Sequence, residues 1–89
     1  MNNKFILESL VMDLKRVAIG NHRKSFAMAN RFYDEALKRK NELDTAVLKE
    51  YLQHILKNIE LLKDKEPEQI AERALMYSTL ILNYTQKFS

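Results

Sequence analysis

The side chains of this 89-residue sequence best suited to binding chemistry are basic and lie in its first half. Residues 1–40 contain nine Lys and Arg against four Asp and Glu, whereas residues 41–89 contain six against eight. Five of these basic residues recur at intervals of seven or eight positions: Arg16, Arg23, Lys24, Arg31 and Lys38. On one continuous helix they would share a face that could neutralise the phosphates of a nucleic acid.

The same basic residues also fit a solvated helix surface, which keeps a protein soluble, or a contact for an acidic protein partner. We expect no aromatic stacking platform among them, and no DNA-binding motif frames them. A break near Gly20 would scatter them over two helices. The sequence therefore favours a plain surface, and nucleic-acid binding is the second hypothesis.

Histidine and carboxylate residues do not form a pattern typical of catalysis or metal binding. Glu50 and His54 lie one turn apart, but di-metal sites in helical bundles use Glu-x-x-His motifs with further inward carboxylates. Asp34 and Glu35 are adjacent, so their side chains diverge by about 100° on a helix. One glycine cannot form a phosphate-binding loop, and the absence of cysteine excludes thiolate chemistry. We predict no enzymatic activity, no cofactor and no metal site.

The composition predicts an all-α fold for the elements that carry these residues. One Gly and one Pro cannot supply the many turns of a β-sandwich or barrel. A hydrophobic content of 46% favours a folded chain over a disordered one. The length suits a single domain over residues 1–89.

Apolar residues recur at three- and four-residue steps along the whole chain, which predicts four helices. Gly20, Asp44 and Pro67 favour helix ends and so indicate the breaks between them. We expect the helices at residues 3–19, 22–41, 45–63 and 67–88. Similar lengths joined by short loops are typical of an antiparallel, up-down four-helix bundle.

Gly20 leaves a second architecture open, in which residues 3–41 form one long kinked helix followed by a helical hairpin, and the chain dimerises. The apolar faces centred on Leu14 and Ala29 differ by about a quarter of a turn, which favours a break. In the first helix we expect Asp13 to lie opposite the apolar face.

The fourth helix holds more apolar residues than one buried face requires. Tyrosine is also enriched at protein interfaces. We therefore predict that this helix forms the interface of a homodimer, with these contact residues: Leu75, Tyr77, Leu80, Leu82, Tyr84 and Phe88. Met12 and Met76 are expected at the margins of the apolar faces.

These features predict a small non-enzymatic protein–protein interaction or regulatory protein that associates with itself. The alternative is a small nucleic-acid-binding regulator that uses the basic residues. Peripheral membrane attachment has less support, because the apolar faces suit a protein core better than lipid. No run of 18 apolar residues and no signal-peptide pattern is present, so we expect a cytoplasmic location.

Overall fold

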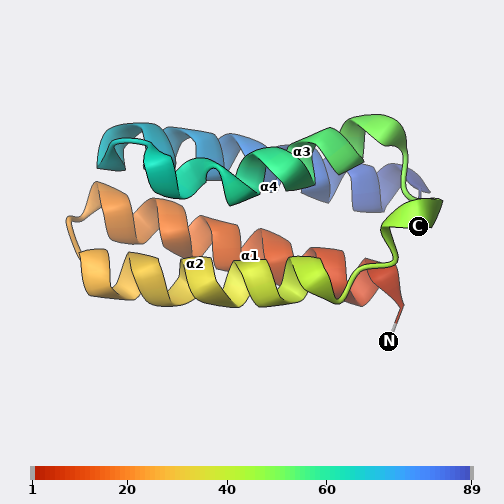
Figure 1. The fold of residues 1–89 in the computed structure, drawn as a ribbon, viewed down its shortest axis with the longest axis horizontal. Coiled ribbons are helices and arrows are strands. Elements are labelled where there is room, and N and C mark those ends of the chain that lie inside the picture. Colours follow the sequence, from red (N-terminus) through yellow and green to blue (C-terminus); the bar gives the residue numbers. More distant parts are fainter. Residues whose placement is uncertain (1, 89) are drawn as a thin grey trace.

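The computed structural model describes residues 2–88, which form four α-helices in an antiparallel bundle (Figure 1). The helices are α1 (Asn3–His22), α2 (Phe26–Asn41), α3 (Glu50–Glu60) and α4 (Pro67–Phe88). Two short 3₁₀ helices, η1 (Thr45–Val47) and η2 (Leu62–Asp64), flank α3. The described residues contain no strand, which confirms the all-α prediction. Because α1 and α2 are separate antiparallel helices, the alternative of one long kinked helix is wrong.

The core forms around α1, which packs along both α2 and α4, while α3 makes fewer contacts. Leu10 and Leu14 of α1 are fully buried against apolar side chains that include Leu52 and Ile59 of α3 and Ile81 of α4. These residues follow the three- and four-residue spacing of an amphipathic helix. None of the helices described is both long and apolar enough to cross a membrane.

The first helix ends later than its glycine suggests. Gly20 lies inside α1, and the left-handed residue that ends the helix is Lys24, with φ 61°. The Ser25 N–H donates to the Gly20 carbonyl at 2.7 Å, and the Lys24 N–H donates to the Asn21 carbonyl at 3.2 Å. These two bonds form a Schellman motif. The prediction that the first helix ends at Gly20 and the second begins at residue 22 is therefore wrong.

Gly20 has a packing role instead. A Cβ atom at this position would lie 2.9 Å from the Cα, Cβ and N atoms of Ala29, which is buried in α2. Real side chains do not approach a backbone so closely. The pairing of Gly20 with Ala29 therefore lets the backbones of α1 and α2 come together just before the turn that joins them.

The third helix is shorter than the predicted 45–63 and is held at both ends by tyrosine hydroxyls. The Tyr84 hydroxyl of α4 accepts from the N–H of Lys49, the N-cap residue of α3, at 3.2 Å. The Tyr33 hydroxyl of α2 donates to the carbonyls of Ile59 at 2.7 Å and Glu60 at 3.1 Å. All three partners are backbone groups at the ends of a helix, where N–H and C=O groups lack bonds within the helix.

The expected cap of that helix, Asp44, makes no side-chain capping bond. Its backbone instead pairs with the Asn3 side chain, which donates to the Asp44 carbonyl and accepts from the Asp44 N–H, each at 3.0 Å. This pairing fixes the α2–α3 connection to the start of α1.

We predict opposite effects for substitutions at the two positions near the first turn. Gly20→Ala should lower the free energy of unfolding by about 1–2 kcal/mol, because the added methyl group meets the Ala29 backbone. Lys24→Gly should raise it by about 1 kcal/mol, because glycine adopts positive φ without strain. Urea denaturation followed by circular dichroism measures both. An increase in stability for Gly20→Ala would contradict the close approach of the helices.

Candidate functional site

Six exposed apolar side chains lie on the outer surfaces of α1 and α4, and we call them the outer apolar face: Phe5, Met12, Ile19, Leu75, Met76 and Leu80. The three from α1 recur at seven-residue steps and are 62%, 46% and 44% exposed. The three from α4 are between 40% and 54% exposed. The helices α1 and α4 that carry these residues are antiparallel neighbours that pack along each other.

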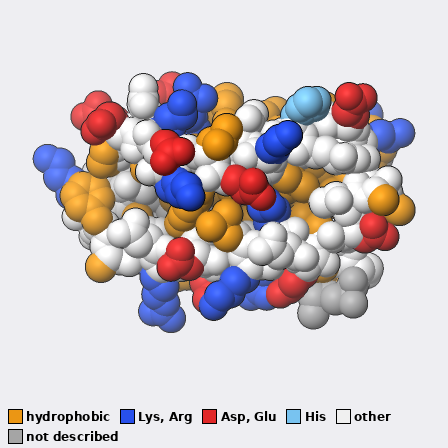
Figure 2. All heavy atoms as spheres, viewed as in Figure 1, with side chains coloured by type: hydrophobic (Ala, Val, Ile, Leu, Met, Phe, Trp, Pro, Cys, Tyr) orange, Lys and Arg blue, Asp and Glu red, His pale blue; other side chains and the backbone are white. Residues whose placement is uncertain are grey.

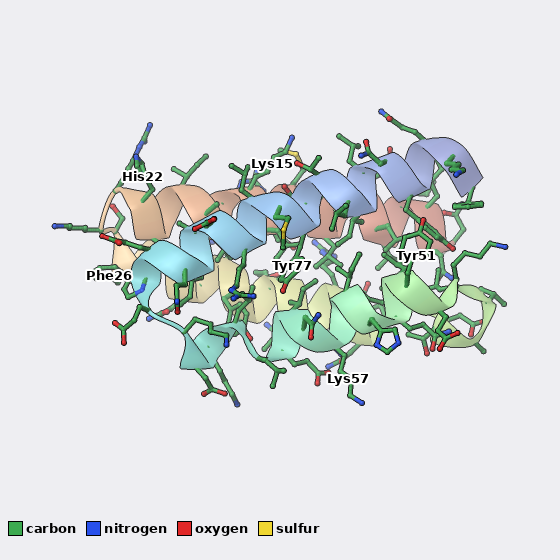
Figure 3. The ribbon with its side chains drawn as sticks, turned by 90° about the horizontal axis from the view of Figure 1, so that it is seen from above. Lys15, His22, Phe26, Tyr51, Lys57 and Tyr77 are labelled. Atoms are coloured by element: carbon green, nitrogen blue, oxygen red, sulfur yellow. The ribbon has the colours of Figure 1, made fainter. Side chains whose placement is uncertain are left out.

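The structure separates the six predicted interface residues of α4 into three groups. Leu75, Leu80 and Phe88 are exposed, whereas Leu82 is half-buried against the core. Tyr77 and Tyr84 are only 5% and 7% exposed, and Tyr77 points into the bundle in Figure 3. For these two residues the interface prediction is corrected, because they fill the core of their own chain.

The α1 part of the outer apolar face was not predicted as an interface, apart from the marginal position of Met12. The sequence indicates this part through the seven-residue spacing of Phe5, Met12 and Ile19. These residues lie on the side of α1 opposite its buried residues. Since Leu10 and Leu14 already supply the buried face, this second apolar line exceeds what the core requires.

An open cleft of about 1260 Å³ lies at one end of this face, between the end of α1, the α1–α2 turn and the start of α4. Ala18, Ile19, Phe26, Ala71 and Leu75 provide its apolar lining. Figure 3 shows Lys15 and His22 projecting outward from α1, with Phe26 at the same end of the bundle. The cleft therefore extends the outer apolar face toward the turn.

Charges of opposite sign line the two sides of this cleft. The basic wall, on α1 and the turn, consists of Lys15, His22, Arg23 and Lys24; the acidic wall, at the start of α4, consists of Glu66, Glu68 and Glu72. None of these seven side chains forms an ion pair within the part of the chain that the structure describes. The charges of the Lys, Arg and Glu side chains among them remain available to a partner.

The five basic residues predicted as a binding stripe do not form one line, because the chain turns at residues 23–25. Arg23 and Lys24 lie at the turn, and Lys38 pairs with Glu35 at 3.7 Å. The hairpin nevertheless brings Arg16 of α1 and Arg31 of α2 to the same aromatic ring. Their guanidinium carbons lie 5.1 and 5.7 Å from the centre of the half-buried Phe32 ring.

A buried carboxylate lies beside this arginine–aromatic cluster. Asp13, expected on the side opposite the apolar face, is only 6% exposed, so that expectation is wrong. Its oxygens lie 3.7 Å from Arg39 Nε and 3.9 Å from Arg16 Nη1. Burial raises the pKa of Asp13, and the two arginines oppose this rise only in part while Glu35 adds to it. The nearby Asp13 Oδ2 and Arg39 Nε make no hydrogen bond.

The pair Glu50 and His54 lies on the surface of α3, 3.9 Å apart, with side chains that are 91% and 71% exposed. Within residues 2–88, no three His, Cys, Asp or Glu side chains lie close enough together to hold a metal ion. Ser78 is fully buried and donates to the Leu75 carbonyl of its own helix at 2.7 Å. The surfaces best suited to function are therefore the outer apolar face, its charged cleft and the arginine–aromatic cluster.

Comparison of the chain with protein-family models, with curated proteins and with solved structures gives no match.

We predict that Asp13 makes the folded chain less stable as the pH rises. Because its folded pKa is above the unfolded value, the folded state binds more protons, and stability declines as the pH rises between the two values. Asp13→Asn should remove this part of the pH dependence and leave stability at pH 7 equal or higher. Urea denaturation of both proteins between pH 3 and 7 gives the difference. A loss of stability in the variant at pH 7 would show that Arg39 and Arg16 outweigh the burial of the carboxylate.

Proposed function

We propose that this protein is a non-enzymatic interaction or regulatory protein that associates with itself through the outer apolar face. The observation that carries the proposal is the exposure of six large apolar side chains on the adjacent helices α1 and α4. Large contiguous apolar patches on soluble proteins mark interaction surfaces more often than plain surface. The seven-residue spacing of Phe5, Met12 and Ile19 is also the spacing by which one helix contacts another.

The opposite side of the molecule has a mixed surface. Figure 2 shows the side formed by α2 and α3, where basic and acidic side chains are interspersed with several apolar areas. Such a mixture is typical of a surface that faces solvent. Exposed apolar side chains also occur beside and on α3, at Val47, Tyr51 and Leu61, so the choice of face depends on the six residues of α1 and α4.

Association through this face can be tested by introducing a charge into it. We expect the unmodified protein to be dimeric at micromolar concentration in analytical ultracentrifugation. Ile19→Glu and Leu75→Glu should each weaken association at least about a hundredfold, because a buried unpaired carboxylate costs several kcal/mol. Val47→Glu is the matched control, since Val47 is 70% exposed on η1.

Circular dichroism should show the same helix content in all of these variants, because the substituted side chains are exposed in the folded chain. A monomeric unmodified protein at every concentration, or a Val47→Glu variant as impaired as the other two, would refute the proposal.

A second function, binding of single-stranded nucleic acid, is favoured by the arginine–aromatic cluster. Arg16, Phe32 and Arg31 place two guanidinium groups around one ring. Aromatic and guanidinium groups stack on bases, while basic side chains neutralise phosphates. The cluster lies on the α1–α2 hairpin, so it leaves the α1–α4 side free for a protein partner.

We expect this second function to appear as salt-dependent binding. Fluorescence anisotropy with a labelled single-stranded oligonucleotide should show affinity falling by about tenfold or more between 50 and 200 mM salt. Arg16→Ala combined with Arg31→Ala should abolish the signal, while the exposed control Lys57→Ala should reduce it only slightly. Absence of binding to both RNA and DNA at the lower salt concentration would exclude it.

A further inference from the structure

We propose that the charged cleft determines how two copies of this chain assemble, by pairing the basic wall of each copy with the acidic wall of the other. The inference rests on the proposed self-association through the outer apolar face. It adds the arrangement of the two copies and the ion pairs that specify it, with Lys15 and Glu72 as the central pair.

The two walls lie on opposite sides of the line along which α1 and α4 meet, which we call the seam. The basic wall belongs to the end of α1 and the turn, and the acidic wall belongs to the first turns of α4. Ile19 of α1 and Leu75 of α4, exposed apolar residues of the outer apolar face, line the same cleft. The basic residues thus lie on the α1 side of the seam, and the acidic residues lie on the α4 side.

Two-fold symmetry gives two ways to stack one such face on another. If the axis runs parallel to the seam, α1 of one copy covers α4 of the second copy. The basic wall then meets the acidic wall twice, and Ile19 faces the second copy's Leu75. If the axis runs across the seam, α1 covers α1 and α4 covers α4, so neither wall meets its opposite.

Electrostatic complementarity therefore selects the axis parallel to the seam. A second copy fits because this rotation places the basic wall of each copy against the acidic wall of the other. A partner with a uniformly acidic or uniformly basic surface would leave one wall opposed to like charge.

The available area is also adequate for a stable dimer. The molecule measures 35 Å along its longest axis and 21 Å along the next. One side of the bundle thus offers roughly 700 Å², close to the ~800 Å² per partner of a standard protein interface. A dimer interface of this size would therefore cover most of the length of the α1–α4 side.

The inferred arrangement is tested by reversing charges on separate copies. Lys15→Glu alone and Glu72→Lys alone should each weaken self-association by about tenfold, because two attractive pairs per dimer become repulsive. When the two variants are mixed, each copy should prefer the other, since both intermolecular pairs become attractive again. Native mass spectrometry with one variant labelled with ¹⁵N counts mixed and unmixed dimers.

A predominance of mixed dimers well above the half expected by chance supports the pairing. Repulsion within one chain cannot produce this result, because it is unchanged by mixing. The control pair Lys57→Glu and Glu50→Lys changes exposed residues of α3, and Figure 3 shows Lys57 on the opposite side of the molecule from Lys15. These controls should mix at random.

The outcomes separate the two proposals. Dimers that form normally in both cleft variants and mix at random would overturn the inferred arrangement but leave self-association through the outer apolar face intact. An unmodified protein that is monomeric at every concentration would overturn both.

Discussion

The close contact between Gly20 and Ala29 is the constraint on which the rest of this structure depends. It brings the backbones of α1 and α2 together at the point where the chain must reverse. The turn can then follow at once, with Lys24 in the left-handed conformation and Ser25 bonded back to the Gly20 carbonyl. A larger side chain at position 20 would separate the helices and move everything that the turn positions.

Two surfaces are built by this reversal. On one side of the hairpin, Arg16 and Arg31 meet at Phe32, although they are fifteen positions apart in the sequence. On the other side, the turn places basic residues across a cleft from the start of α4. Both are surfaces made by the meeting of two elements, and neither exists on an isolated helix.

Tyrosine residues connect the remaining helix to this framework. Tyr33 of α2 and Tyr84 of α4 bind backbone groups at opposite ends of α3, so its position depends on both neighbours. Such side chains satisfy the polar groups that helix ends leave unpaired and bury their rings at the same time. This is why Tyr84 belongs to the core and is not available to a partner.

The sequence by itself determined the all-α class, the four helices and the bounds of α4, because apolar periodicity and Pro67 are local signals. It also indicated that more apolar residues are present than one core needs. Only the tertiary structure decided which residues those are. It buried Tyr77 and left Leu75 exposed, because the direction of a side chain depends on which neighbours its helix contacts. The packing role of Gly20 could not be predicted for the same reason. A side chain at this position is excluded only because α2 packs against it.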